Sequence, residues 1–186
     1  MTILLTASNA HHANLVVPLR LELEHLGHAV VIVYGGRRNP WWKPVGGHHI
    51  SRYVRWPAWS RRALLEQACR RALRVHDVDL SIVTSARYHL EQTMLRLAKP
   101  CVIYHSTYFM EVRYGLGPRL EYYDVGDEIW TQGEHLREQL VAHGVMPERI
   151  HVVGRPGPRE LYERDGQTAE RMEAVVRGCQ TKEEMA

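Results

Sequence analysis

The sequence predicts an α/β domain in which a doubly wound parallel sheet lies between two helical layers, a three-layer α/β/α arrangement. Six short apolar or β-branched runs lie along the chain, of the kind shown by strands that are buried on both faces. Helical patterns long enough to connect parallel strands separate most of these runs. With 186 residues, 45% of them hydrophobic and 24% charged, the chain suits one cored domain and is too short for two large ones.

The predicted strands and helices alternate along the chain, which is typical of a Rossmann-like single domain. The strands are expected at residues 3–7, 29–34, 78–84, 101–105, 128–131 and 150–153, and the helices at residues 14–26, 61–74, 87–98 and 134–143. Residues 49–56 alternate imperfectly and predict a further short strand. We expect the domain to span residues 1–162, with its first strand central in the sheet, and residues 163–186 to form a C-terminal helix and a frayed tail.

The first helix carries signals for both of its ends. Asn14 is a plausible N-cap, and leucines spaced three or four residues apart from Leu15 to Leu26 line one face. Gly27 suits the left-handed position that ends a helix. If Asn14 is the cap, Pro18 lies at the end of the first turn, where its missing N–H removes a single backbone bond.

The composition indicates a reduced, cytoplasmic chain without a bound metal or cofactor. Cys69, Cys101 and Cys179 are odd in number and far apart, which fits free thiols better than a disulfide framework or a zinc site. The histidine pairs at 11–12 and 48–49 would point away from each other on regular structure, so they indicate no metal site. The sequence has no recognisable leader, no apolar run near the roughly 20 residues that span a bilayer, and no phosphate loop.

A basic segment without acidic residues lies between the second predicted strand and the second predicted helix. No Asp or Glu occurs between Glu24 and Glu66, whereas basic residues are interleaved with tryptophans over residues 37–62, which we call the Trp/Arg segment. Tryptophan and arginine side chains suit a sugar, nucleic acid or phosphorylated partner, and equally suit anionic membrane headgroups. The third interpretation is a solvated loop. The candidate anion-binding residues are Arg37, Arg38, Trp41, Trp42, Arg52 and Arg55.

Two stretches resemble the N-terminal, acceptor-side domain of glycosyltransferases with the GT-B fold, which is related to the UDP-sugar transferase and UDP-GlcNAc 2-epimerase-like superfamily. The family pattern G-H-x-N-P, a leucine-rich helix and then R-G-H-x-V is matched by His12, Asn14, Leu19, Leu23, Gly27, His28 and Val30. The family pattern that ends this domain is matched by Asp127, Gly144, Pro147, Ile150, Val152, Val153, Gly154 and Pro156. Two departures are His11 in place of the glycine and a proline three places late.

The resemblance implies half of a two-domain enzyme. In the family, the nucleotide-sugar sits mainly on a second Rossmann-like domain, but only two dozen residues follow Tyr162 in this sequence. We therefore expect the acceptor-side half of a glycosyltransferase, which needs a donor-binding half in trans for sugar transfer. The alternative is a non-catalytic module that binds a sugar, a nucleotide or an anionic surface. The sequence alone leaves open whether the chain is an enzyme.

The candidate site lies in the loops after the predicted strands, because ligands of open parallel sheets bind beyond the carboxyl ends of the strands. The resemblance implies that His12 removes the proton from the acceptor hydroxyl, and a helix N-terminus lowers an imidazole pKa and so favours the neutral form that a base needs. The alternative is that His12 only hydrogen-bonds the backbone at a cap. His105 either binds a sugar hydroxyl or phosphate or is a loop histidine satisfied by its neighbours. The candidate substrate-binding residues are Ser8, Asn9, His11, Ser85, Arg87, His105, Ser106, Gln132 and Glu134.

Overall fold

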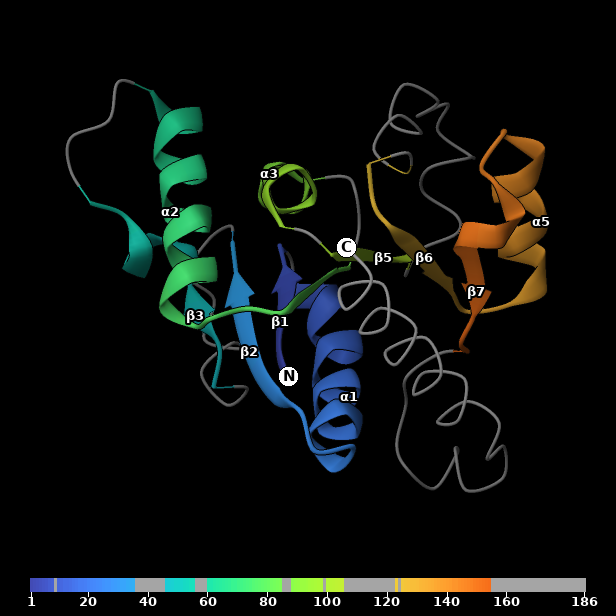
Figure 1. Ribbon diagram of the computed structural model, residues 1–186, viewed down its shortest axis with the longest axis horizontal. Helices are drawn as coiled ribbons and strands as arrows, with labels where there is room; N and C mark the ends of the chain where they lie inside the picture. The colour runs from blue at the N-terminus through green and yellow to red at the C-terminus, as the bar shows by residue number, and fades with distance from the viewer. Residues whose placement is uncertain are drawn as a thin grey trace.

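The protein is an α/β domain built on one parallel sheet (Figure 1). The computed structural model describes residues 1–8, 10–35, 46–55, 60–84, 88–98, 100–105, 123 and 125–154. Within them the strands are β1 Thr2–Ala7, β2 Ala29–Tyr34, β3 His48–His49, β4 Leu80–Val83, β5 Cys101–His105, β6 Glu128–Thr131 and β7 Ile150–Val152. The helices are α1 Ala10–His25, α2 Arg61–Val75, α3 His89–Leu97 and α5 Glu134–Ala142, with short 3₁₀ turns η2 Ile50–Tyr53 and η4 Pro147–Arg149.

The sheet order places the first strand inside the sheet, as the sequence predicts. The seven described strands follow the order β3-β2-β1-β4-β5-β6-β7, and every neighbouring pair is parallel. Leu4 of β1 pairs with Val31 of β2 on one side and with Ser81 of β4 on the other. The strand order therefore reverses direction at β1 and β4, the place where open α/β sheets bind their ligands.

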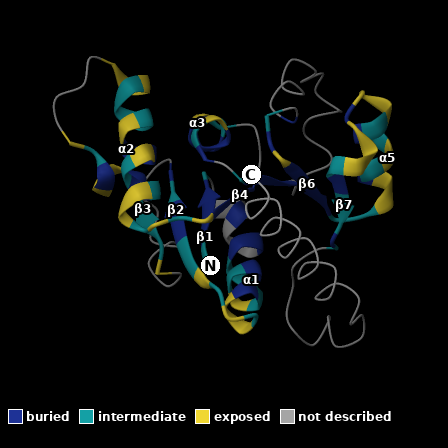
Figure 2. Ribbon diagram, in the orientation of Figure 1, coloured by how far each residue is buried: buried dark blue, intermediate teal, exposed yellow. Residues whose placement is uncertain are grey.

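Two apolar cores lie on the two faces of the sheet, because successive strand residues point to opposite faces. In β1, Ile3 and Leu5 pack with α1 residues such as Leu19, whereas Leu4 packs on the other face with α2 and α3. Figure 2 shows the buried strands between helices whose outer faces are exposed. Both cores exclude solvent from the strands, which explains why the strand segments appear in the sequence as continuous apolar runs. The expected three-layer α/β/α fold is thus confirmed.

The largest differences from the predicted elements are at helix α1 and strand β3. The helix begins at Ala10 rather than after Asn14, so it has one more N-terminal turn than expected, and the alanines in this turn favour a helical backbone. Pro18 therefore lies in the helix interior. The prediction that Asn14 is the N-cap is therefore wrong. Gly27 does adopt the expected left-handed backbone, with φ of 86°. The strand expected over residues 49–56 is two residues long, and the chain then turns into η2.

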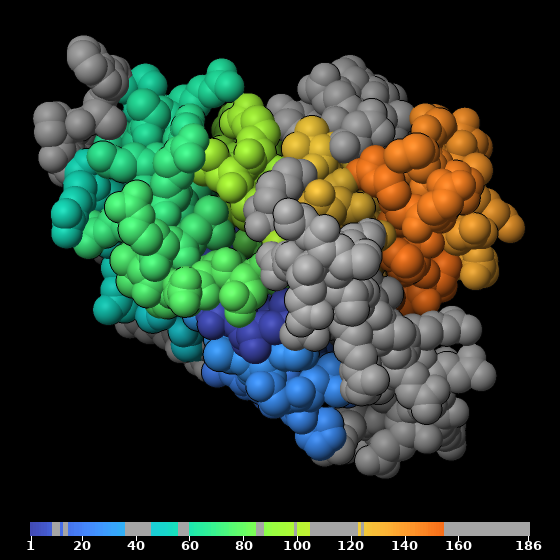
Figure 3. Space-filling model, in the orientation of Figure 1, coloured from blue at the N-terminus to red at the C-terminus, as the bar shows by residue number. Residues whose placement is uncertain are grey.

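Helices α2 and α5 lie at opposite edges of the sheet. Helix α2 lies at the β3 end and α5 at the β7 end, so the two helices are separated by the width of the sheet (Figures 1 and 3). Cys69 and Cys101 are both buried, and burial raises the pKa of the Cys69 thiol to about 12. Across the described ranges, no helix is both long and apolar enough to cross a membrane. The expected tail, residues 163–186, and Cys179 lie outside the described residues.

Candidate functional site

Four side chains from distant parts of the chain meet at the carboxyl ends of β1 and β4. Ser8 directly follows β1, and His12 lies in the first turn of α1. Thr84 directly follows β4, and Glu91 lies in the first turn of α3. Because β1 and β4 are adjacent and parallel, the residues that follow them lie side by side at the same edge of the sheet.

The imidazole of His12 is oriented through its Nδ1 atom. Thr84 Oγ1 lies 2.9 Å from His12 Nδ1 and also donates to the carbonyl oxygen of Thr6 at 2.9 Å. A threonine hydroxyl has one hydrogen, so with that hydrogen on the Thr6 carbonyl it accepts the second bond from an Nδ1–H group. The amide N–H of Ser8 donates to Nδ1 over a longer distance, 3.4 Å. The Thr84 contact suits an Nδ1–H tautomer, whereas the Ser8 contact suits a lone pair on Nδ1, so both tautomers of His12 have a partner at this atom.

Glu91 brings a carboxyl group into the same cluster, and its side chain is 0% exposed. Its Oε2 atom accepts a hydrogen bond from Ser8 Oγ at 2.6 Å, whereas its buried Oε1 atom has no hydrogen-bond partner. Burial raises the pKa of Glu91 to about 8, although the hydrogen bond from Ser8 acts in the opposite direction. The carboxyl is therefore mostly neutral at pH 7. Because this carboxyl keeps its proton, its 3.8 Å approach to His12 Nδ1 is not an ion pair.

Two further residues shape the surroundings of this cluster. The ring of Tyr88 meets the ring of His12 edge to face, with 5.8 Å between ring centroids. Gly35, the residue after β2, has no side chain to separate this strand end from α3. A Cβ atom built there would lie 3.1 Å from Leu90 Cδ2 and 3.6 Å from Ser8 Oγ. Glycine thus allows the ends of β1 and β2 to pack closely against the start of α3.

Of the predicted site residues, the structure brings Ser8 and His12 together and leaves Gln132 and Glu134 apart from them. The latter two follow β6, which is separated from β1 by β4 and β5, so three strand spacings place them about 14 Å away. Glu134 is exposed and lies 3.7 Å from Arg137 in an i,i+3 ion pair. Only the backbones of His11 and His105 are described. Asn9, Ser85, Arg87 and Ser106 lie outside the described residues.

The sequence reasoning missed Thr84, Tyr88 and Glu91 as site residues. For Glu91 a signal was present, because Met94, Leu95 and Ala98 follow it at spacings of three, four and seven residues. These positions form one stripe along a helix, and an acid on an otherwise apolar stripe is rarely buried without a role. No comparable signal marks Thr84, whose importance comes from its contacts with the first strand and the first helix.

The described part of the Trp/Arg segment forms, together with His76 at the end of α2, a separate cluster of aromatic and basic side chains. The rings of His48 and His76 are stacked, with centroids 5.7 Å apart, and Tyr53 Oη lies 2.7 Å from His76 Nε2. Arg52 Nη1 lies 3.1 Å from His48 Nδ1. Burial is the larger cause that lowers the pKa of His48, and the positive charge of Arg52 lowers it further. Arg52 therefore has a structural contact, and Arg55 is exposed. Arg37, Arg38, Trp41 and Trp42 lie outside the described residues.

Comparisons with known proteins identify the fold. No family model matches the sequence, and no curated protein matches it. Among solved structures, the chain is similar to UDP-GlcNAc 2-epimerase from Neisseria meningitidis bound to UDP-GlcNAc, with a TM-score of 0.65 and 12% identity over 94% of this chain and 54% of the other. It is also similar to the UDP-GlcNAc 2-epimerase from Methanocaldococcus jannaschii, with a TM-score of 0.62, 11% identity and coverage of 83% and 46%.

The chain is also similar to part of a glycosyltransferase from Rickettsia africae. It gives a TM-score of 0.52 and 15% identity over 83% of this chain and 42% of the other. The chain thus spans about half the length of the solved proteins that it matches. These likenesses establish that the chain is a single domain of the GT-B and epimerase fold, and so confirm at the level of fold the resemblance found in the sequence.

Proposed function

We propose that this domain is the acceptor-side half of a glycosyltransferase, which transfers a sugar only together with a donor-binding half supplied in trans. The observation that carries the proposal is the orientation of His12. In the tautomer with the ring hydrogen on Nδ1, this hydrogen is donated to Thr84 Oγ1, and Nε2 carries the lone pair that acts as the base. A neutral histidine in this tautomer, at the carboxyl edge of a parallel sheet, is suited to remove a proton from a hydroxyl group.

In the proposed reaction, His12 Nε2 takes the proton of the acceptor hydroxyl. The acceptor oxygen forms a bond to the anomeric carbon of the sugar, and the bond from this carbon to the nucleoside diphosphate breaks. The proton leaves a positive charge on the imidazole, whose Nδ1–H stays on Thr84 Oγ1. The Glu91 carboxyl keeps its proton, and the lone pairs of its Oε1 atom, 3.8 Å from His12 Nδ1, offset a small part of this charge.

The proposal of a second half rests on the share of each similar protein that this chain matches. This chain corresponds to about half of each similar solved protein, and in GT-B enzymes the other domain holds most of the nucleotide-sugar. We expect the acceptor to be a sugar, a nucleotide or a phosphorylated compound. The exposed Arg55 is suited to contact anionic groups of the acceptor. A substitution of Arg55 also tests for a membrane or nucleic-acid contact, and it is preferable to one of Arg52, whose side chain contacts His48. Arg55→Gln should weaken any such binding, and added salt should do the same.

The burial of His12 favours a second candidate function. Its side chain is 4% exposed, so an acceptor reaches Nε2 only if neighbouring groups move. In the second candidate, the domain binds a sugar or nucleotide without turnover, and His12 serves to join α1 to β4 through Thr84. Replacing His12 would then lower stability and leave the chemistry of any partner unchanged.

The two candidate functions predict different effects of His12→Ala on the rate of sugar transfer. The experiment pairs the purified chain with a lone donor-type domain encoded in the same genome, and measures nucleotide release from UDP-, GDP- and TDP-sugars in the presence of sugar acceptors. The chain alone should show no turnover. If His12 is the base, His12→Ala should lower the rate of the pair by about 10²- to 10⁴-fold, whereas His25→Ala, at the exposed end of the same helix, should not.

Two results would contradict the first candidate. Turnover by the chain alone would show that no donor-binding half is needed. Equal rates for the native pair and the His12→Ala pair would exclude His12 as the base. A separate test of the carrying observation is the ¹⁵N NMR spectrum of the imidazole, in which the native protein should show the Nδ1–H tautomer. Thr84→Val should shift it toward the mixture found in free histidine.

A further inference from the structure

The outer face of α2 carries an excess of positive charge. The helix contains five arginines, one acidic residue and no lysine, which gives it a net charge of +4, five minus one. Four of the arginines are exposed, and we call them the α2 arginine surface: Arg61, Arg62, Arg70 and Arg74. Figure 2 shows exposed residues along the length of this helix. Among the described residues, none of the four pairs with the cluster of His12 and Glu91, so the inference does not depend on the proposed function.

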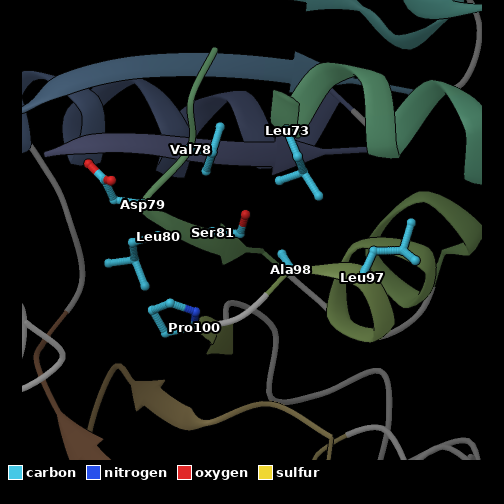
Figure 4. A pocket seen from close by; sticks show the side chains of 8 residues that line it. All are labelled: Leu73, Val78, Asp79, Leu80, Ser81, Leu97, Ala98 and Pro100. Atoms are coloured by element: carbon cyan, nitrogen blue, oxygen red, sulfur yellow. The ribbon is translucent and has the colours of Figure 1, made fainter. Parts of the chain in front are cut away.

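The inner face of the same helix is used for packing. Ala68, Cys69 and Ala72 are 0% exposed, and Leu73 extends from α2 into the depression where β4 begins (Figure 4). Of the exposed residues of α2, only Val75 is apolar. The outer face therefore offers a partner little apolar area, and binding to it depends on charge.

The positions of these arginines work against the stability of the helix. Arg61 and Arg62 lie in its first turn, where the helix dipole favours acidic residues, and this turn contains no acid. Arg74 suits the dipole at the other end, but it lies four residues from Arg70, a spacing at which like charges repel. Within the described part of the chain, only Arg70 has an ion-pair partner, Glu66 at 2.9 Å. Helix stability thus does not explain the arginines, whereas an anionic partner would offset their repulsion.

The spread and the type of these residues narrow the class of partner. Arg61 and Arg74 are 13 residues apart, which is about 20 Å along a helix axis at a rise of 1.5 Å per residue. A small anion cannot reach across this length, so the partner is an extended polyanion. The planar guanidinium group forms two parallel hydrogen bonds with a phosphate group. Duplex nucleic acid carries one phosphate charge per about 1.7 Å of its axis, so many phosphates lie within the length of the surface.

Two other polyanionic partners fit the surface less well. A helix that lies on a membrane inserts an apolar face between the lipids, but the apolar face of α2 packs inside the domain. An acidic protein would need buried anchor side chains for stable binding, and α2 exposes only Val75. Contacts with nucleic acid phosphates need neither, because charge supplies essentially all of the free energy of non-specific binding.

We propose that the α2 arginine surface binds the phosphate backbone of a nucleic acid without recognising its sequence. The guanidinium groups replace cations that surround the phosphates, and the release of these cations makes the affinity fall as salt is added. The surface lies on the helix at the β3 end of the sheet, whereas the candidate site lies at the carboxyl ends of β1 and β4.

Fluorescence anisotropy with a labelled DNA duplex tests the proposal. A duplex of about 15 base pairs is longer than the surface, at 3.4 Å per pair, and salt is varied from about 50 to about 200 mM. The triple variant with Arg61→Gln, Arg62→Gln and Arg74→Gln should bind about tenfold or more weakly at the lowest salt. Its plot of log affinity against log salt should be less steep by about 2.7, since each phosphate contact contributes about 0.9.

Two further variants separate this surface from the charge of the whole molecule. Arg20→Gln, Arg96→Gln and Arg137→Gln combined remove the same net charge from three other helices, and the affinity should stay within about threefold of the native value. Glu66→Gln removes the one acid of α2 and frees Arg70, so it should tighten binding about three- to tenfold. Such a gain cannot come from unfolding.

Several outcomes would overturn the proposal. No binding of the duplex at the lowest salt would mean that the surface is only solvated. Equal weakening in the two triple variants would mean that the attraction belongs to the whole molecule. Tighter binding to phosphatidylglycerol vesicles or to polyglutamate than to the duplex would indicate a membrane or an acidic protein as the partner. If thermal melting shows that the α2 triple variant is destabilised, Glu66→Gln decides the question, and an affinity that is unchanged or weaker in that variant overturns the proposal.

Discussion

The buried carboxyl of Glu91 should make the protein less stable as the pH rises, and Glu91→Gln should remove this dependence. Burial raises the pKa of Glu91 from its ordinary value of 4.5 to about 8. Between these two values the folded protein keeps a proton that the unfolded chain has released. Stability falls with pH wherever the folded state binds more protons. The loss therefore begins near pH 4.5, continues to about pH 8 and then levels off.

The size of the effect follows from the same two pKa values. Each pH unit in this range changes the free energy of unfolding by about 1.4 kcal/mol, so the full loss is on the order of 5 kcal/mol. Glutamine has the shape of the protonated acid and stays neutral at every pH. Its amide can also donate to Ser8 Oγ in place of the bond that Glu91 Oε2 now accepts. We expect Glu91→Gln to match the native protein near pH 5 and to exceed its stability by several kcal/mol at pH 8.

Urea unfolding at pH 5, 6, 7, 8 and 9 measures this difference. The comparison between native and variant cancels the titration of the other groups, including the twelve histidines. Glu66→Gln is the matched control, since Glu66 is a half-exposed acid that pairs with Arg70 on the surface of α2. Its difference from the native protein should stay nearly constant with pH. If the difference in the free energy of unfolding between the native protein and Glu91→Gln is the same at pH 5 and pH 8, the reasoning is refuted.

Three other substitutions test separate features by urea or thermal unfolding. Thr6→Val removes a buried hydroxyl that has no hydrogen-bond partner, so stability should stay unchanged or rise by up to about 1 kcal/mol; a clear loss would mean that the hydroxyl is paired. Gly126→Ala places a Cβ atom 2.8 Å from Ile103 Cγ1 and 2.9 Å from its Cδ1, and should cost about 1–3 kcal/mol, whereas unchanged stability would show that Ile103 moves freely. Burial and the nearby Arg52 lower the pKa of His48, so below pH 6.5 the unfolded chain binds a proton that the folded protein does not bind, and the free energy of unfolding falls. His48→Gln should reduce this loss of stability. An equal loss in the native protein and the variant would contradict the prediction.

The strands of this fold could be predicted because they are buried on both faces. Ile3 and Leu4 lie in different cores, and both cores are apolar, so the strand appears as a continuous run. Strand β3 could not be predicted in its true form. It consists of His48 and His49, which pair with the end of β2 and have no hydrophobic pattern of their own.

The candidate site was predictable only where it depends on local sequence. Ser8 and His12 follow the first strand directly, so the rule that ligands bind at carboxyl ends of strands identifies them. Thr84 and Glu91 contact them across 72 and 83 residues of sequence. Those contacts exist because β4 rather than β2 borders β1 on that side, and strand order is a property of the whole sheet that hydrophobic periodicity does not encode.

The same strand order sets when the domain can be completed during synthesis. Thr2 and Ser8 must wait for Asp79 and Glu91, which leave the ribosome 77 and 83 residues later. At 5–20 residues per second, this delay is roughly 4 to 17 s. During it, β1 can pair with β2 but presents an unpaired edge on its other side to every neighbouring chain. A nascent chain stalled before residue 80 should therefore be a target for chaperones, and one released there should aggregate through the open edge of its first strand.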